Sequence, residues 1–135
     1  MDKKWWDFHR ADVDKVFSGE RYSHGERKGV VKVRHPFFKQ GGQNSGAGAI
    51  ALAHHFGARR VILLGYDCSF EPGTNKRHWH GDHERNGGSG NAGSVNKWPA
   101  QFKKLLGLVS GMDVVNCSRR TALTTFPLAK LEDVL

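Results

Sequence analysis

Apolar positions in the N-terminal part of the chain follow patterns that predict a helix and then a strand. Residues 2–17 place apolar side chains at three- and four-residue intervals, as one face of an amphipathic helix requires. Ser18-Gly19 ends this helix. After a polar stretch, the apolar run at residues 30–33 predicts a short strand. Pro36 prevents its continuation as a central strand, because proline lacks the N–H that a sheet interior uses.

The middle of the chain has the pattern of a glycine-rich loop, a short helix and a buried strand. The loop is residues 41–46, and the helix is residues 47–56, for which Asn44 or Ser45 is a good N-cap. The β-branched run at residues 60–64 is typical of a strand in a parallel sheet. The expected inward face of the helix comprises Ile50, Ala53 and Phe56, with Leu52 beside them.

The C-terminal half alternates in the same way after one long polar segment. Residues 71–97 are the least hydrophobic part of the chain, and a loop this long is usually functional or disordered. We predict a helix over residues 99–108, a strand over 112–117 and a last short helix over 128–135. The side chains expected to face inward around the first of these helices are Phe102, Leu105, Leu106 and Val109.

This order of elements predicts an α/β fold in which βαβ units build a mainly parallel sheet. At 135 residues, a single domain over residues 1–135 is the default. Ligands of such sheets bind outside the carboxyl ends of the strands. Three polar segments fall at those ends and are expected to converge there: Asn44-Ser45-Gly46, Gly65-Tyr66-Asp67 and Asn116-Cys117-Ser118.

Composition narrows the class of protein. Hydrophobic residues make up 38% of the chain and charged residues 25%, which is a globular balance. No apolar run approaches the roughly 20 residues of a membrane-spanning helix, and the N-terminus lacks the apolar core of a signal peptide. Cys68 and Cys117 are too few for a disulfide framework. We therefore expect a cytoplasmic protein with reduced thiols and no membrane partner.

Positive charge is concentrated in the first 60 residues. They contain 12 Lys and Arg against 6 Asp and Glu, residues 61–135 contain 9 against 7, and the net charge is +8. A basic half suits phosphate-bearing ligands or nucleic acid, although it also serves solubility alone. Aromatic and basic side chains near the N-terminus either stack on nucleobases or pack one helix face on the sheet. They are Trp5, Trp6, Phe8, His9 and Arg10.

The glycine-rich loop is a candidate anion site. Glycines let the backbone approach an anion, and the helix start behind them offers N–H groups and a partial positive charge. Asn44 and Ser45 can add side-chain donors, and a plain capped helix is the alternative. The pattern G-x-G-x-x-A fits residues 46–51, with Asp67 about 20 residues on. The preceding strand ends about ten residues too early for a dinucleotide-binding fingerprint, so we do not adopt that interpretation.

The string H-x-H-x-D-H in the polar segment matches the metal-binding signature of the metallo-β-lactamase family. It is formed by His78, His80, Asp82 and His83, and alternate histidines can present their imidazoles to Zn²⁺. That fold also needs an apolar strand before the string and a histidine after it, and the sequence has neither. A metal-dependent hydrolase using His78, His80 and His83 is therefore the weaker alternative. His78 or His83 could instead act as an acid or base near neutral pH, or the loop is simply solvated.

Four segments carry a resemblance to a known family: GGQNSGAGAIALAHHFGARRVILLGYD, KRHWHGDH, WPAQFKKL and VVNCSRRTALTTFPLAKLEDVL. They resemble phage-borne relatives of the MptE-like family (6-hydroxymethylpterin diphosphokinase-like, motility accessory factor). The bacterial lipooligosaccharide sialyltransferases are more distantly similar. The resemblance covers about residues 40–135. It rests on the N-S-G helix start, the apolar strand that ends in G-[YF]-D, and the H-W-x-G-D-H element, which accounts for the lactamase-like string without a metal.

The resemblance implies a Rossmann-like, three-layer α/β domain of a transferase-type family that binds a nucleotide or nucleotide-sugar. Such an enzyme would transfer a sugar or a diphosphate group, and the resemblance identifies no cofactor. Ser45 and Gly46 would lie by the nucleotide phosphate with Asn44 beside them, and Asp67 would orient the ribose or base. The catalytic candidates on the reacting side are His78, Asp82 and His83, with Asp82 or His83 near the position of the family's base.

Full-length relatives carry an earlier βα unit with its own glycine-rich nucleotide loop, and this chain begins after it. The Rossmann-like domain is therefore expected to be incomplete. It would be the C-terminal piece of a longer enzyme, a short version that has lost catalysis, or a half that a partner chain completes, as in a homo-oligomer. The rival hypothesis is a non-enzymatic phage protein that uses the fold as an interaction module. Its basic half would then bind nucleic acid or an acidic partner in the host cytoplasm.

Overall fold

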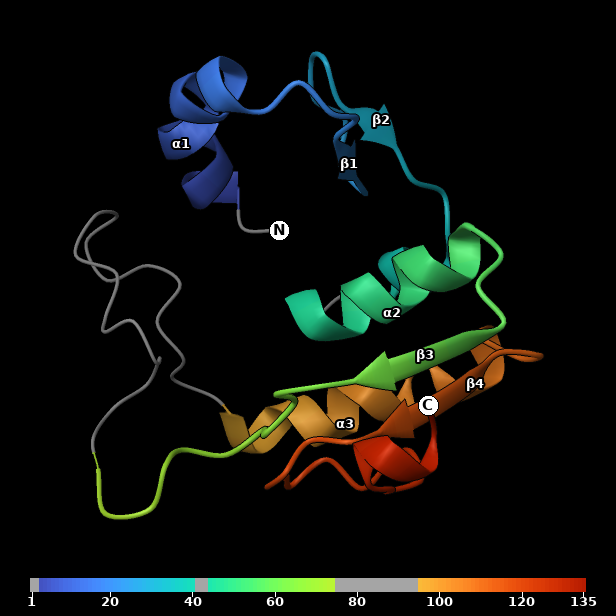
Figure 1. Cartoon of the computed structure of the whole chain (residues 1–135). Coiled ribbons are helices and arrows are strands. Elements are labelled where there is room, and N and C mark those ends of the chain that lie inside the picture. The colour runs from blue at the N-terminus through green and yellow to red at the C-terminus, as the bar shows by residue number, and fades with distance from the viewer. Residues whose placement is uncertain (1–2, 41–43, 75–94) are drawn as a thin grey trace. The chain divides into compact units, whose positions relative to one another are not determined.

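The computed structural model describes residues 3–40, 44–74 and 95–135, and for residues 3–5 only the backbone (Figure 1). The contacts between residues divide the chain into two units. Of the described residues, 3–33 and 71–74 belong to the first unit, and 34–40, 44–70 and 95–135 belong to the second unit. The described part of the first unit has one helix and a short parallel pair of strands, and that of the second unit has several helical segments and another parallel pair, so the fold is mixed α/β.

The first unit begins with the expected amphipathic helix, α1 (Lys3–Val16). Two short strands follow, β1 (Tyr22–Ser23) and β2 (Val31–Lys32), which pair in parallel. The N–H of Val31 donates to the carbonyl of Arg21, at 2.8 Å. The strand predicted at residues 30–33 is thus confirmed over two residues, and β1 is a strand that the apolar pattern does not indicate.

In the second unit, the helix predicted over residues 47–56 is present, but it begins two residues earlier and ends one residue earlier than predicted. A 3₁₀ turn, η1 (Pro36–Lys39), comes first, and α2 (Ser45–His55) follows. Asn44 is the N-cap, and its side-chain oxygen accepts a hydrogen bond of 2.8 Å from the N–H of Ala47. Gly57 ends the helix in the left-handed conformation, with φ of 80°.

Strands β3 (Arg60–Leu63) and β4 (Asp113–Asn116) form the parallel sheet of the second unit. Arg60 pairs with Asp113 and Leu63 with Asn116, so both strands run toward the same edge. On the other side of β4, Asn116 forms an isolated parallel bridge with Leu128. The predicted parallel arrangement is therefore confirmed for these two strands.

The connection between the strands ends in a series of short helical segments. They are η2 (Val95–Lys97), α3 (Trp98–Lys103) and η3 (Leu106–Leu108), and η4 (Leu131–Asp133) follows β4 near the C-terminus. The helix predicted over residues 99–108 is thus an α-helix only as far as Lys103. None of the helices within the described ranges is long and apolar enough to cross a membrane.

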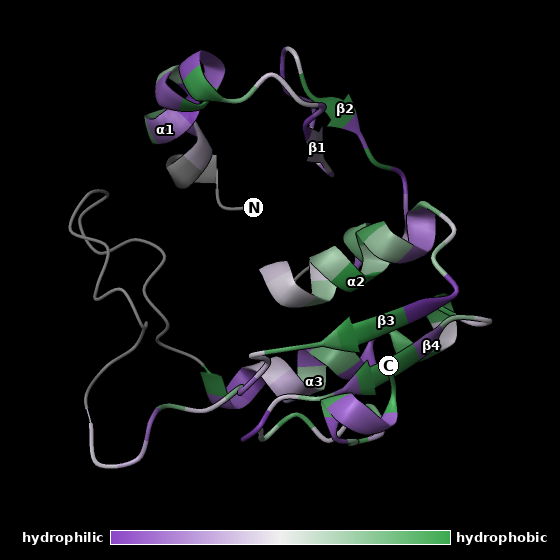
Figure 2. Ribbon diagram, viewed as in Figure 1, coloured by the Kyte–Doolittle hydropathy of each residue, from purple (hydrophilic) through white to green (hydrophobic). Residues whose placement is uncertain are grey.

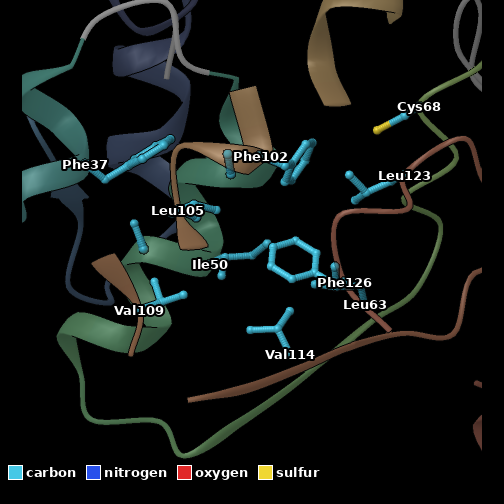
Figure 3. Close-up of a cluster of buried hydrophobic side chains, with 12 residues drawn as sticks. Phe37, Ile50, Leu63, Cys68, Phe102, Leu105, Val109, Val114, Leu123 and Phe126 are labelled. Atoms are coloured by element: carbon cyan, nitrogen blue, oxygen red, sulfur yellow. The ribbon is translucent and has the colours of Figure 1, made fainter. Parts of the chain in front are cut away.

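The core of the second unit is a cluster of buried apolar side chains from η1, α2, α3, β3 and β4 and from the segments that follow them (Figure 3). Apolar residues are frequent along α2, β3 and β4, whereas α1 mixes polar and apolar positions (Figure 2). In β3 and β4 the residues of the core are Leu63 and Val114. The whole buried cluster comprises Phe37, Ala47, Ile50, Ala51, Leu63, Cys68, Phe102, Leu105, Val109, Val114, Leu123 and Phe126.

Two predicted core residues are exposed, and both lie where a helix ends. Phe56 is 57% exposed because α2 stops at His55 and buries the face formed by Ala47, Ile50 and Ala51 instead. Leu106 is 54% exposed because the chain changes from α to 3₁₀ geometry after α3, and the tighter turn rotates this side chain outward.

The predicted C-terminal helix at residues 128–135 is also wrong. The backbone at its start is extended and hydrogen-bonded to β4. The N–H of Asn116 donates to the carbonyl of Pro127, and the N–H of Ala129 donates to the carbonyl of Asn116. Only the single 3₁₀ turn η4 forms after that, and the sheet hydrogen bonds outweigh the local helical pattern.

Candidate functional site

The three polar segments at the carboxyl ends of the strands come together around Tyr66. The backbone N–H of Tyr66 donates to the hydroxyl oxygen of Ser118, at 2.8 Å, just after β4. At the other end of the same residue, the phenol hydroxyl donates to the carbonyl of Gly46 in the first turn of α2, at 3.4 Å. The predicted convergence of the start of α2 with the ends of β3 and β4 is therefore observed.

Asn44 positions the start of α2. Its Oδ1 accepts from the N–H of Ala47, and its Nδ2 donates to Oε1 of Gln101 in α3, at 2.9 Å. The sequence suggests Asn44 as a side-chain donor to phosphate; in the structure its Oδ1 and one of the two N–H groups on Nδ2 are engaged within the protein. Its role in this geometry is to join α2 to α3.

Packing alone explains why residue 46 is glycine. A Cβ placed there would lie 3.0 Å from Cε1 of Tyr66 and 3.3 Å from Cζ of Phe102. Both contacts are tighter than ordinary van der Waals contact, so glycine allows the two rings to pack against the helix start. Ser45, by contrast, is exposed in the first turn. The N–H groups of both residues have no acceptor within the helix.

Asp67 and Cys68 extend the site beyond Tyr66. Asp67 is half-buried, and its carbonyl accepts from the N–H of Ala122 at 2.7 Å, which ties the end of β3 to the segment after β4. Burial, and to a lesser degree the charge of Asp67, raises the pKa of the Cys68 thiol. Cys68 is therefore protonated at neutral pH and unsuited to nucleophilic chemistry. Burial likewise raises the pKa of the Tyr66 phenol, with a smaller contribution from Cys68.

A buried hydrogen-bond network shapes the segment after β4. Asn116 is 1% exposed, and its Nδ2 donates to Oγ1 of Thr121 and to the carbonyl of Leu123, both at 3.1 Å. Its Oδ1 accepts from the N–H of Ser118, also at 3.1 Å. The sequence marks Asn116 and Ser118 as candidates but gives no reason to single out Thr121, whose partners become neighbours only in the folded chain.

The histidine-rich string lies outside the described residues. This applies to the predicted catalytic residues His78, Asp82 and His83, and to His80 of the alternative metal site. In the part of the chain that the structure describes, no group of three or more His, Cys, Asp or Glu side chains could hold a metal ion.

Several basic side chains of the N-terminal segment form ion pairs. Within the described part of the first unit, Arg10 and Arg21 pair with Asp14, and Arg27 pairs with Asp7. Lys15–Asp12 and Lys32–Glu26 are two further ion pairs. Trp6 is only 7% exposed, with the Arg27 guanidinium 5.9 Å from its ring centroid, so its ring is not free to stack on a base. The ion pairs leave the net positive charge of the first 60 residues unchanged, so the nucleic-acid alternative stays a prediction.

A pair of histidines between η1 and α2 is a feature that the sequence does not single out. Nδ1 of His35 accepts from the N–H of Phe37 at 3.2 Å, so its proton is on Nε2, which lies 3.1 Å from Nδ1 of His54. His35 is 6% exposed, and burial lowers its pKa below the usual 6.5. The charges of His54 and His55 add to this, while the backbone of Leu108 acts in the opposite direction.

We expect the second unit to lose stability as the pH falls below about 6.5, because the unfolded chain then takes up a proton that folded His35 resists. The stability that neutral His35 contributes is fully present above the pKa of this histidine in the unfolded chain. It is lost as the pH falls toward its lower pKa in the folded protein. His35→Asn should reduce this dependence while keeping a cap for Phe37. Urea midpoints between about pH 7.5 and pH 5 test this. His55→Asn, at an exposed position, should keep most of the wild-type slope, and an unchanged slope in His35→Asn would contradict the prediction.

Compared with known proteins, the chain matches no family model, no curated protein and no solved structure.

Proposed function

We propose that the second unit is a nucleotide- or nucleotide-sugar-phosphate-binding domain of transferase type, with a Rossmann-like arrangement. The observation that carries this proposal is the meeting of the start of α2 with the carboxyl ends of β3 and β4 around Tyr66. Parallel α/β sheets bind ligands at this edge, and a helix start there offers N–H groups and a partial positive charge to a phosphate.

The roles follow from position. The phosphate would accept hydrogen bonds from the N–H groups of Ser45 and Gly46 and from the Ser45 hydroxyl, which is exposed at the first position of α2. The first turn of α2 contains no acidic side chain that would repel the anion. Asp67 would take the ribose hydroxyls or the base. His78, Asp82 and His83 lie outside the described residues, and a catalytic role for them is only what the resemblance implies.

Ser45→Asp tests the anion site without disturbing the fold. An acidic residue in the first helical turn stabilises a helix by about 0.3–1 kcal/mol, so this variant should unfold no more easily than the wild type. At the site itself, two like charges about 4 Å apart repel by about 1 kcal/mol in water and about 4 kcal/mol near a protein surface. Affinity for a nucleotide should therefore fall about tenfold or more.

The measurement is isothermal titration after a thermal-shift screen of nucleoside mono- and diphosphates. Saturation at about 100 times the dissociation constant should stabilise the wild type by about 2.7 kcal/mol. Ser110→Asp is the matched control, because Ser110 is an exposed serine just before β4, at the opposite end of the strand. Equal affinity of Ser45→Asp and wild type would exclude this anion site, and a wild type that binds no nucleotide would contradict the proposed function.

A further inference from the structure

Both ends of the turn that follows β4 are hydrogen-bonded to one residue, Tyr66, which lies just after the neighbouring strand β3. At its start, the Ser118 hydroxyl accepts from the backbone N–H of Tyr66, at 2.8 Å. At its end, the Thr121 hydroxyl donates to the backbone carbonyl of the same tyrosine, at 2.6 Å. Tyr66 thus uses both of its backbone polar groups to hold residues 118–121.

The same turn is held from its buried side by Asn116. This side chain accepts from the N–H of Ser118 and donates to the hydroxyl of Thr121, so the two residues that contact Tyr66 also share a partner beneath them. The N–H of Leu123 adds a bond of 2.9 Å to the Thr121 hydroxyl. The backbone of this turn is therefore ordered before any ligand arrives.

The two residues at the tip of this turn are Arg119 and Arg120, and both are exposed. Neither forms an ion pair with a carboxylate of the described residues, whereas Arg60, at the opposite end of the sheet, lies 3.0 Å from Asp113. The turn thus presents two adjacent guanidinium groups, without carboxylate partners in the described chain, at the edge where the start of α2 lies.

We propose that Arg119 and Arg120 form a second anion-binding point, and that the ligand of this edge carries a diphosphate group. The proposal rests on the proposed function, since it specifies the nucleotide that the same site binds. A terminal phosphate carries about −1.5 to −2 charges at pH 7, whereas a helix start supplies only about half a positive charge. A single phosphate suits the start of α2, and a second one needs the two arginines.

The chemistry of arginine supports this assignment. The guanidinium is charged at every physiological pH, and its planar donors match two phosphate oxygens at once. Because Ser118, Thr121 and Asn116 already order the backbone of the turn, binding sacrifices less conformational freedom there than in a free loop. The site should therefore prefer a nucleoside diphosphate to the corresponding monophosphate.

The test compares a nucleoside diphosphate, its monophosphate and inorganic pyrophosphate by isothermal titration on the full chain. The wild type should bind the diphosphate about tenfold more tightly or better, the effect of one or two charge-assisted hydrogen bonds. Arg119→Ala with Arg120→Ala should abolish this preference and weaken pyrophosphate binding. The matched control is Arg59→Ala with Arg60→Ala, which removes two adjacent arginines at the amino end of β3 and should keep the preference.

Each outcome decides between the two proposals. If the wild type binds both nucleotides equally, or if the Arg119/Arg120 variant keeps the preference, the second anion-binding point is wrong while nucleotide binding stands. If pyrophosphate binds through these arginines but neither nucleotide binds, the anion-binding point stands and the nucleotide function is wrong. If no probe binds the wild type, both are wrong.

Discussion

Phe102→Ala should lower the free energy of unfolding of the second unit by about 3–5 kcal/mol, the usual cost of deleting a buried phenylalanine ring. Phe102 is 2% exposed and comes from α3. Its ring meets Tyr66 edge-on, with centroids 5.8 Å apart, and meets Phe126 at 6.3 Å. Alanine would leave a cavity beside both rings. Because the free energy of unfolding of a typical domain is only about 5–15 kcal/mol, this loss would be a large share of its stability.

Urea unfolding followed by circular dichroism gives the change directly. Phe102→Leu keeps most of the volume and should cost less than about 1.5 kcal/mol if the neighbours adjust, which keeps the test readable if the alanine variant does not fold. Leu106→Ala, at the exposed position in η3, should stay within about 0.5 kcal/mol of wild type. A loss at Phe102 no larger than that at Leu106 would mean that α3 does not pack as described.

Asn116→Ala is expected to cost about 2–4 kcal/mol, because it leaves buried polar groups unpaired at about 1–3 kcal/mol each. The substitution removes the donors to Thr121 and to the carbonyl of Leu123, and the acceptor for the N–H of Ser118. Water cannot easily replace these bonds, since Asn116 is 1% exposed. The same change releases the turn that carries Arg119 and Arg120.

Two readouts check this prediction. Urea unfolding should show the loss of stability, and amide hydrogen exchange at residues 118–123 should quicken more than exchange in α2. Asn96→Ala, at an exposed asparagine in η2, is the matched control and should change neither. If the amides of this turn exchanged as slowly in Asn116→Ala as in the wild type, the hydrogen-bond network of Asn116 would not be what orders the turn.

The parallel sheet of the second unit could be predicted because its strands are visible as apolar runs. Residues 60–64 and 112–117 each carry enough β-branched side chains to indicate a strand between polar or helical segments. β1 could not be predicted, since Tyr22–Ser23 lies in a polar stretch and forms a strand only through its backbone bonds with β2. The helix predicted over residues 128–135 is wrong for a similar reason. The backbone bonds to β4 that hold the start of this segment extended cannot be recognised in its local pattern.

The site could be predicted in outline but not in its connections. The end of each strand can be recognised in the sequence, and the carboxyl ends of parallel strands lie at one edge of the sheet. The meeting of Asn44, Tyr66 and Ser118 therefore follows from the predicted topology. Which atoms are already engaged does not follow, because the amide of Asn44 is bound to Gln101 and the hydroxyl of Thr121 to Tyr66. These partners lie far along the chain and leave no trace in the local pattern.

That long sequence separation has a consequence for how the protein folds. The bonds from Tyr66 to Ser118 and Thr121 join residues 52 and 55 positions apart, and the bond from Asn44 to Gln101 spans 57. Contacts of this kind must close a long loop before they return any stabilisation, so they form late. Recovery of ligand binding in a refolding experiment should therefore lag behind the return of helical circular dichroism. The rate at which ligand binding recovers would then report the last step of folding rather than the initial collapse of the chain.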